Sequence, residues 1–242
     1  MIIPTHKKSS IVILTGAGIS AESGIPTFRD SNGLWENHRI EDVATPEGFQ
    51  RDPDLVFKFY NDRRKAAQKA QPNAGHLALA KLEKNWQGDF LLVTQNVDNL
   101  HERAGSKKLV HMHGSLNSAL CMVCGQHIGW KEDITQSSTC PHCHNTRSLR
   151  PDIVWFGEFP YHMDQIEKAL HNADYFVAIG TSGQVYPAAG FVALAQAAGA
   201  HTVEINIDKK IGTNERSNFD EKIFGPASQK VPEFVEHILN IQ

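Results

Sequence analysis

Four short runs of apolar residues recur along the chain, at residues 11–16, 89–95, 174–182 and 201–206. Each run is rich in β-branched or aromatic residues and ends in a polar turn, a pattern that predicts buried strands. Residues 76–86, 187–200 and 231–239 have the apolar spacing of helices. Strands that alternate with helices predict an α/β fold, a Rossmann-like, doubly wound parallel sheet with helices on both faces.

Two regions interrupt the alternation. Residues 117–150 are polar, contain every cysteine and lack a clear apolar stripe, which predicts a small inserted module. Residues 22–60 carry Gly, Pro and aromatic residues without clear periodicity, so they are predicted to be irregular.

The composition is that of an ordinary soluble globular protein. Hydrophobic residues make up 40% of the 242 residues and charged residues 21%, which is ample for one large domain with an insert. The formal net charge of -3 gives no strong field for nucleic acid or anionic membrane. No apolar run has the length of a membrane span or of a secretion signal, so we expect a cytoplasmic protein that binds neither membrane nor nucleic acid.

The cysteines form two C-x-x-C pairs, Cys121 with Cys124 and Cys140 with Cys143, separated by fifteen residues. In a cytoplasmic chain this spacing predicts metal binding and not disulfides. Four thiolates complete the tetrahedral shell of one Zn²⁺, so the ion is predicted to be structural.

Two alternatives exist for the cysteine region. His142 and His144 lie beside the second pair, but a complete set of four thiolates makes them unnecessary as ligands. A nucleic-acid-binding zinc ribbon is disfavoured, because the segment has few basic residues.

The first predicted strand runs into a glycine turn, Gly16-Ala17-Gly18-Ile19-Ser20-Ala21, of the form G-x-G-x-x-A. After a strand, such glycines let the backbone approach a pyrophosphate closely, although a tight strand–helix turn alone can also select them. A dehydrogenase needs a second strand ending in Asp or Glu about 20 residues further on. Glu41 and Asp42 lie at that distance but end no strand pattern, and the intervening loop carries an Arg and two aromatic residues that suit phosphate and a planar ring.

Polar side chains follow two more of the predicted strands. Gln95, Asn96 and Asp98 come after one, and Gly180-Thr181-Ser182 after another. Ligands of doubly wound sheets bind outside the carboxyl ends of the strands, where these groups can read an amide or a ribose. Helix capping explains one polar residue of the first set, and a plain turn is the alternative for the second.

His111 and His113 flank Met112 in the stretch LVHMHGS. In an extended chain both point to one face, and a histidine at a strand end is a candidate general base. The alternative, a hydrogen-bonded structural histidine, holds for most of the 13 histidines.

Several motifs occur in one order: GAGISAESGIPTFRD-x2-GLW, TQN-x-DNLH, HMHGS, the paired C-x-x-C, VWFGE and GTS-x2-VYPAAG. Together they resemble the sirtuins, the NAD-dependent protein-lysine deacylases, from about residue 8 to about 238. The sequence looks most like the bacterial CobB-type members, close to the desuccinylase branch. The resemblance implies a large Rossmann-like domain (residues 8–35, 70–116 and 151–242) and a small module with a helical part (36–69) and a zinc-binding part (117–150).

The resemblance also implies that NAD+ is a co-substrate and that acylated lysine in a protein or peptide is the partner; it leaves the oligomeric state open. No hydride moves: the acyl oxygen attacks the nicotinamide ribose, nicotinamide leaves, and water finally gives free lysine and acyl-ADP-ribose. His113 matches the catalytic base, which takes a proton from the ribose hydroxyls, and Asn96 is a second catalytic residue. The implied cofactor contacts are Gly16, Ala17, Gly18, Ser20, Ala21, Thr27, Phe28, Arg29, Trp35, Gln95, Asn96, Asp98, Gly180, Thr181, Ser182, Asn206, Asp208 and Ala227.

The implied substrate contacts fall in two groups. One is the segment that pairs with the substrate backbone, Val154, Trp155, Phe156, Gly157 and Glu158. Val185, much later in the chain, is a further implied contact. The other is Ala44, Tyr60 and Arg63, where the i, i+3 spacing puts the Tyr and the Arg on one helix face. In the resembling branch this pair reads the carboxylate of a succinyl group, whereas an exposed basic helix is the alternative.

Three other functions remain open at the level of sequence. A dehydrogenase is disfavoured by the loop after Ala21. A protein mono-ADP-ribosyltransferase would use the same nucleotide site. A non-catalytic module that binds acyl-lysine would need no base.

Overall fold

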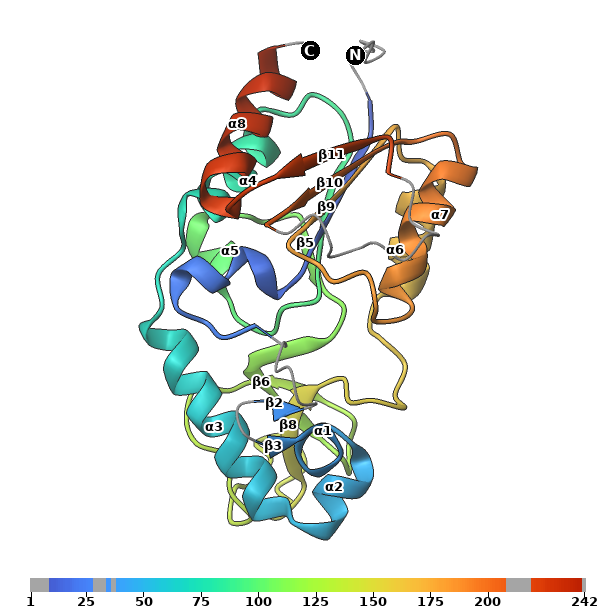
Figure 1. Cartoon of the computed structure of the whole chain (residues 1–242). Helices are drawn as coiled ribbons and strands as arrows, with labels where there is room; N and C mark the ends of the chain where they lie inside the picture. Colours follow the sequence, from blue (N-terminus) through green and yellow to red (C-terminus); the bar gives the residue numbers. More distant parts are fainter. Residues whose placement is uncertain (1–8, 28–33, 36–37, 208–218, 241–242) are drawn as a thin grey trace.

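The computed structural model describes residues 9–27, 34–35, 38–207 and 219–240. Among these residues, no helix combines the length and the apolar character needed to cross a membrane. They form a large α/β layer structure and, below it in Figure 1, a smaller part built from helices and a second sheet.

The large part is centred on a six-stranded sheet in which every neighbouring pair is parallel. Its order is β11 (Glu221–Phe224), β10 (His201–Asn206), β9 (Tyr175–Ile179), β1 (Ile11–Thr15), β4 (Phe90–Thr94) and β5 (Leu109–His111). The central strands β1, β4 and β9 are buried throughout, which explains their continuous apolar sequences. The predicted parallel sheet is confirmed.

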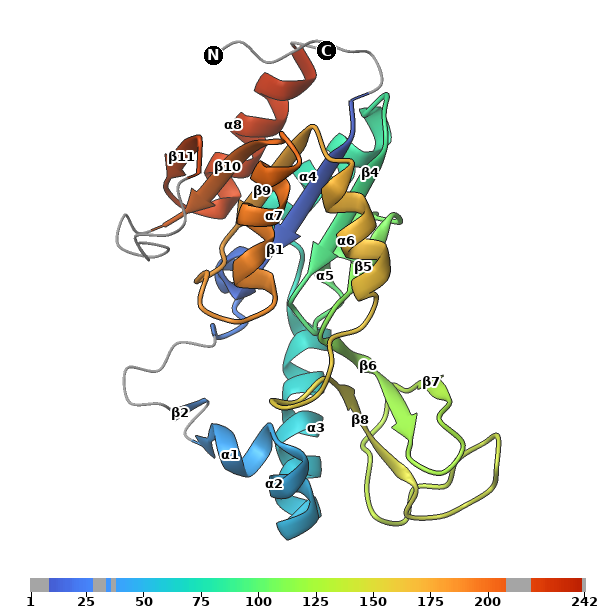
Figure 2. The same cartoon turned by 90° about the vertical axis from the view of Figure 1, so that its right-hand side faces the viewer.

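Helices cover both faces of this sheet (Figure 2). On one face, Ile11 and Ile13 of β1 pack in a cluster with residues of α4 (Ala74–Asn85) and α8 (Ala227–Asn240). On the other face, Val12 and Leu14 pack in a cluster with residues of α6 (Met163–His171) and α7 (Phe191–Ala197). Alternate residues of one strand therefore belong to two separate cores, as in a doubly wound fold.

The smaller part has its own core. A three-stranded antiparallel sheet has the order β7 (His127–Gly129), β6 (Gly114–Cys121) and β8 (Leu149–Ile153). A long helix, α3 (Pro53–Lys69), lies beside it, and a two-stranded pair is formed by β2 (Leu34–Trp35) and β3 (His38–Arg39). The remaining helices are α1 (Ile40–Val43), α2 (Pro46–Arg51) and, in the large part, α5 (Leu100–Ala104); 3₁₀ turns occupy residues 17–19, 21–23 and 188–190.

The expectation of an irregular region over residues 22–60 is wrong where α1, α2 and α3 form. Helix α1 has 4 residues and α2 has 6, too few to show a period. Helix α3 hides its period because its buried face includes polar side chains, Asn61 and Arg64, among the apolar ones. The division into domains at the predicted boundaries stays a prediction.

Candidate active site

The polar turns predicted from the sequence meet at one edge of the large sheet. They follow the neighbouring strands β10, β9, β1 and β4, whose carboxyl ends lie together because the strands are parallel. Gln95 Nε2 donates to Thr181 Oγ1 at 3.0 Å, and Asn206 Nδ2 donates to the Thr181 carbonyl at 2.9 Å. Asn96 Nδ2 donates to the Gly16 carbonyl at 3.1 Å. The structure thus brings together four segments that are far apart in sequence.

The glycines of the first turn are required by another piece of backbone. A Cβ on Gly18 would lie 2.7 Å from the Gly180 Cα, and one on Gly16 would lie 2.8 Å from the Gly180 carbonyl oxygen. Gly180 itself has a φ of +60°, where glycine is favoured, and a Cβ there would lie 2.6 Å from the Ile19 nitrogen. The two turns therefore cross at backbone contact, and the Gly18 N–H donates to the Gly180 carbonyl at 2.8 Å.

Beneath these turns lies a buried network of polar side chains. Ser20 Oγ donates to Asp98 Oδ2 at 3.0 Å and accepts from Asn96 Nδ2 at 3.2 Å. Asp98 Oδ1 accepts the Leu100 N–H at the start of α5. Burial raises the pKa of Asp98, although the bonds from Leu100 and Ser20 partly oppose the shift. Asp98 therefore combines a capping role with contacts at the site.

Two buried histidines in this network were not predicted as site residues. His76 Nε2 lies 3.4 Å from Ser20 Oγ, and His101 Nε2 lies 3.0 Å from Thr15 Oγ1. The centroids of the His76 and His101 rings are 4.9 Å apart. Burial lowers the pKa of His76 to about 4 and that of His101 well below its ordinary value, so both are neutral near pH 7. The signal for His76 was its place on the apolar stripe of a predicted helix.

His113 follows β5 and lies between the turn after β4, through Gln95, and the segment that begins at Val154. Its Nδ1 lies 3.2 Å from the Gln95 carbonyl, which can only accept, so the proton belongs on Nδ1 and Nε2 is the basic nitrogen. Burial lowers the pKa of His113, and the Gln95 carbonyl only partly opposes this. His113 is thus a neutral imidazole near pH 7, as a general base must be.

His111 points to the same β4–α5 connection but has a different environment. Its Nδ1 lies 2.9 Å from the Asn96 carbonyl and its Nε2 lies 2.8 Å from Glu102. Burial lowers the pKa of His111, but the hydrogen bond and charge of Glu102 outweigh it, so the net shift is upward. With both nitrogens engaged, His111 is a structural histidine.

The segment at residues 154–158 joins His113 to the small part of the molecule. The Val154 N–H donates to the His113 carbonyl at 3.0 Å, and the Phe156 N–H donates to the Ala44 carbonyl at 3.0 Å. Glu158 forms two 2.7 Å hydrogen bonds with the Arg150 guanidinium. Burial raises the pKa of Glu158, but Arg150 outweighs this effect, so the carboxylate stays charged. The segment is therefore held firmly between the two parts.

Tyr60 and Arg63 of α3 lie in this neighbourhood, each beside a tryptophan. The Tyr60 hydroxyl accepts from Trp155 Nε1 at 3.1 Å and is fully buried. The Arg63 guanidinium stacks 4.2 Å from the centre of the Trp35 ring. The structure thus brings Tyr60 into contact with the 154–158 segment, and places Trp35 against the α3 helix.

The four cysteines converge in the small part. Their sulfur atoms all lie within 4.8 Å of one another, with Cys121 Sγ 3.7 Å from Cys143 Sγ and Cys124 Sγ 3.8 Å from Cys140 Sγ. A tetrahedral zinc with Zn–S bonds of about 2.3 Å separates its sulfurs by about 3.8 Å. The geometry therefore fits one Zn²⁺ bound by four thiolates, with no open coordination position.

The other predicted contacts are placed as follows. Ala227 opens α8, where the Ser228 N–H donates to Glu22 of the first turn at 2.9 Å, so this helix end lies beside the glycine turn. Ser20 is buried, whereas Ala21 is exposed. Ser182 and Val185 are half-buried in the turn after β9. Phe28, Arg29 and Asp208 lie outside the described residues, and Thr27 is the last described residue before that gap.

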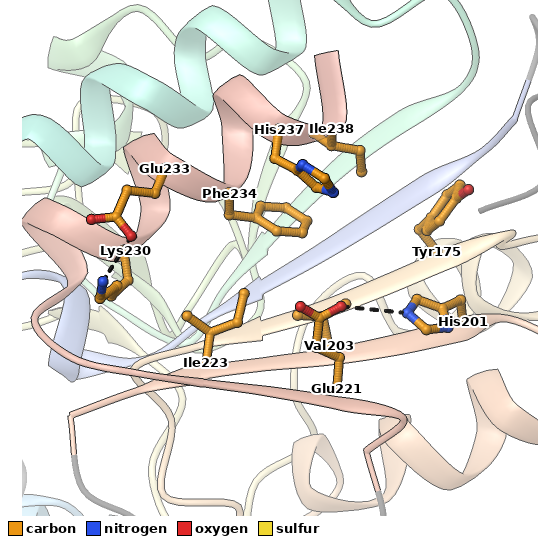
Figure 3. A pocket seen from close by; sticks show the side chains of 10 residues that line it. All are labelled: Tyr175, His201, Val203, Glu221, Ile223, Lys230, Glu233, Phe234, His237 and Ile238. Carbon is orange, nitrogen blue, oxygen red and sulfur yellow. Dashed lines mark hydrogen bonds and ion pairs between the residues drawn. The ribbon is translucent and has the colours of Figure 1, made fainter. Parts of the chain in front are cut away.

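A groove of about 280 Å³ lies elsewhere, between α8 and the strands β9, β10 and β11 (Figure 3). Tyr175, His201 and Glu221 line it and are the first residues of their strands. Since ligands of such sheets bind at the carboxyl ends, and no predicted site residue lines this groove, it is separate from the candidate site.

Comparison with known proteins identifies relatives over nearly the whole chain. The model of the Sir2 family matches residues 16–187. The NAD-dependent protein deacylase of Bdellovibrio bacteriovorus is 58% identical over 232 residues, which cover 95% of this chain and 97% of that protein.

Two solved structures are similar in fold. A Sir2 homolog–NAD complex superimposes with a TM-score of 0.85 at 38% identity, covering 96% of this chain and 91% of that chain. A Sir2 protein bound to acetylated peptide superimposes with a TM-score of 0.79 at 28% identity, covering 96% and 94%.

Proposed function

Because the chain belongs to the Sir2 family, we propose that it is an NAD-dependent protein deacylase that removes acetyl and succinyl groups from protein lysines. The products are nicotinamide, 2′-O-acyl-ADP-ribose and free lysine. NAD+ is consumed as a co-substrate, and the single zinc ion is structural.

The position of His113 carries this proposal. Its side chain bonds the Gln95 carbonyl in the nucleotide-site turn, and its own carbonyl accepts from Val154 in the proposed substrate segment. A neutral base is therefore held where the two substrates would meet. We assign it the removal of the ribose hydroxyl proton, which requires the free Nε2 lone pair.

The nucleotide is assigned to the edge formed by the turns after β1, β4, β9 and β10. Gln95, Asn96 and Asp98 are proposed to hold the nicotinamide and its ribose, and Asn206 the adenosine ribose. These side chains offer the amide and carboxylate groups that such partners require. Val154 to Glu158 would pair with the peptide backbone, which provides affinity with little demand on sequence.

Succinyl recognition is assigned to Tyr60 and Arg63, and the small side chain of Ala44, which is buried in the same cluster as Tyr60, is proposed to keep the acyl pocket wide. A succinyl group ends in a carboxylate, which a guanidinium and a phenol can both bind by hydrogen bonds. An acetyl group ends in a methyl and uses neither. The pair therefore distinguishes the two acyl groups by charge.

A peptide panel tests the proposal. Acetyl-lysine and succinyl-lysine peptides are incubated with and without NAD+, and all products are measured by mass spectrometry. We expect deacylated peptide and acyl-ADP-ribose only with NAD+. ADP-ribose found attached to protein would instead indicate a mono-ADP-ribosyltransferase, and binding without any product would indicate a non-catalytic module.

The variant Arg63→Met tests acyl recognition. Loss of one charge-assisted pair, worth about 1.5–3 kcal/mol, lowers kcat/KM for succinyl peptide about 10- to 150-fold. Deacetylation should fall much less. Lys58→Met removes an exposed positive charge from the same helix and serves as the matched control, with both activities retained. An equal loss of both activities in Arg63→Met would refute the carboxylate-reading role.

We further propose a reducing compartment such as the cytoplasm. Zinc binding requires all four cysteines as reduced thiolates, and their sulfurs are grouped as such a site requires.

A further inference from the structure

The Tyr60 hydroxyl is buried, and its proton has no hydrogen-bond acceptor among the described residues. Tyr60 is fully enclosed, and its only hydrogen bond among the described residues is the one it accepts from Trp155 Nε1 at 3.1 Å. An indole N–H can only donate, so it occupies a lone pair of the phenol oxygen. The phenol proton must then point away from Trp155, and no acceptor for it lies within hydrogen-bond distance in the described part of the chain.

Trp155 is itself held from three sides. Its backbone N–H donates to Glu158 Oε2 at 2.9 Å. The Arg150 guanidinium lies 3.8 Å from the centre of its ring and forms the two-bond ion pair with Glu158. The Phe49 ring packs at 5.2 Å. The indole therefore cannot turn away from Tyr60 without breaking several contacts.

We propose that Trp155 is a positioning residue that makes Tyr60 an obligate hydrogen-bond donor, and so gives the enzyme its preference for acyl groups that carry an acceptor at their end. The inference rests on the proposed role of Tyr60 in reading the acyl group. A carboxylate oxygen takes the unused proton, whereas an acetyl methyl leaves a buried donor unsatisfied, which is costly.

This arrangement also couples two parts of substrate recognition. Trp155 and Glu158 belong to the segment proposed to pair with the peptide backbone, while Tyr60 belongs to α3. Burial raises the pKa of Tyr60, with the Trp155 hydrogen bond opposing only part of the shift, so the phenol keeps its proton throughout the working range. The segment proposed to bind the peptide backbone therefore also fixes the direction of the Tyr60 proton through Trp155.

The test is a double-mutant cycle with Trp155→Phe and Tyr60→Phe, measured on succinyl and acetyl peptides. Without the indole N–H the phenol proton is no longer directed, and the ratio of kcat/KM for succinyl over acetyl peptide should fall about 3- to 10-fold, mainly through KM for the succinyl peptide. In the Tyr60→Phe background, Trp155→Phe should change this ratio no further, because its effect acts through the hydroxyl. A merely structural role would lower both activities together and would add to the Tyr60→Phe effect.

Controls separate the possible failures. Trp130→Phe removes a buried indole N–H that has no partner among the described residues, and it should leave both activities intact. If Trp155→Phe does not fold, β-(3-benzothienyl)alanine at position 155 keeps the shape of tryptophan and removes only the N–H. An unchanged ratio in Tyr60→Phe would refute the proposed reading of the acyl group. If Tyr60→Phe changed the ratio but the substitution at position 155 did not, the positioning role of Trp155 would be overturned. Additive effects of the two substitutions on the ratio would overturn it as well. In both cases the proposed reading of the acyl group by Tyr60 would stand.

Discussion

The glycine at position 18 offers a direct test of what the first turn requires. Gly18→Ala introduces a Cβ that would lie 2.7 Å from the Gly180 Cα and 2.8 Å from its carbonyl oxygen. Both neighbours are backbone atoms and cannot rotate away. To restore an ordinary contact of 3.4 Å, the two turns must separate by roughly 0.7 Å. That movement also stretches the 2.8 Å hydrogen bond from the Gly18 N–H to the Gly180 carbonyl.

The expected cost is about 1–3 kcal/mol for the overpacking. For a chain of this size each kcal/mol lowers the melting temperature by about 2–4 °C, so we expect a decrease of roughly 4–8 °C for a cost near the middle of the range. The loss must appear without NAD+, because the clash is internal to the protein. Urea and thermal unfolding, followed by circular dichroism with zinc present and no nucleotide, measure it.

Gly129→Ala is the matched control. A Cβ at Gly129 meets nothing within 4 Å, and its φ is outside the region that favours glycine. The same substitution there should leave the free energy of unfolding unchanged or raise it by up to about 1 kcal/mol. If Gly18→Ala unfolded at the same urea concentration as the wild type and lost only NAD+ binding, the turn would be shaped for the ligand and not for Gly180.

Two further predictions concern the base and the metal. Because burial lowers the pKa of His113, its neutral form persists as the pH falls. The acid limb of the kcat/KM profile should therefore have its midpoint below pH 6.5. A midpoint above pH 6.5 would contradict a buried, neutral base. Removing zinc with a chelator should lower the unfolding temperature and abolish activity, because Cys121 and Cys140 belong to the core of the small part. Added zinc should restore the unfolding temperature and activity of the wild type but not those of Cys140→Ser. Metal analysis and thermal unfolding measure this. A metal-free protein with an unchanged unfolding temperature would refute the structural role of zinc.

Much of the large sheet could be predicted because the apolar pattern of its central strands follows from their burial. The central strands β1, β4 and β9 are buried on both faces, so their sequences are continuous apolar runs. The short strand β11 was missed because its four residues, EKIF, are half-buried or exposed at the edge of the sheet. The strand pattern is therefore strong where both faces are covered and weak at the edges.

The helices before residue 70, which only the resemblance implied, also carry start signals in the sequence. Thr45 and Asp52 each accept a backbone N–H three residues on, and each is followed by a proline at the first helical position. Such a cap followed by proline is a start signal that does not depend on apolar spacing. The signal was present in the sequence, although the period was hidden.

The glycine turn shows a limit of a different kind. The sequence indicates that the backbone at Gly16 and Gly18 approaches something closely, but it does not identify the neighbour. The neighbour within the fold is Gly180, more than 160 positions away. Distant pairs such as Ser20 with His76 are equally invisible, since a buried polar side chain reveals its partner only when the chain is folded.

The hydrogen bonds of the candidate site suggest where its selectivity arises. Gln95 and Asn206 already donate to Thr181, so a ribose that binds them exchanges existing bonds, and the net gain from each is small. The Tyr60 proton has no acceptor in the described structure, so an acyl carboxylate that binds it adds a bond. Sites that hold an unsatisfied buried donor reject analogues without an acceptor far more strongly than sites that only exchange bonds. On this reasoning we propose that the nucleotide contacts determine orientation, and that Tyr60, together with Arg63, makes the choice among acyl groups.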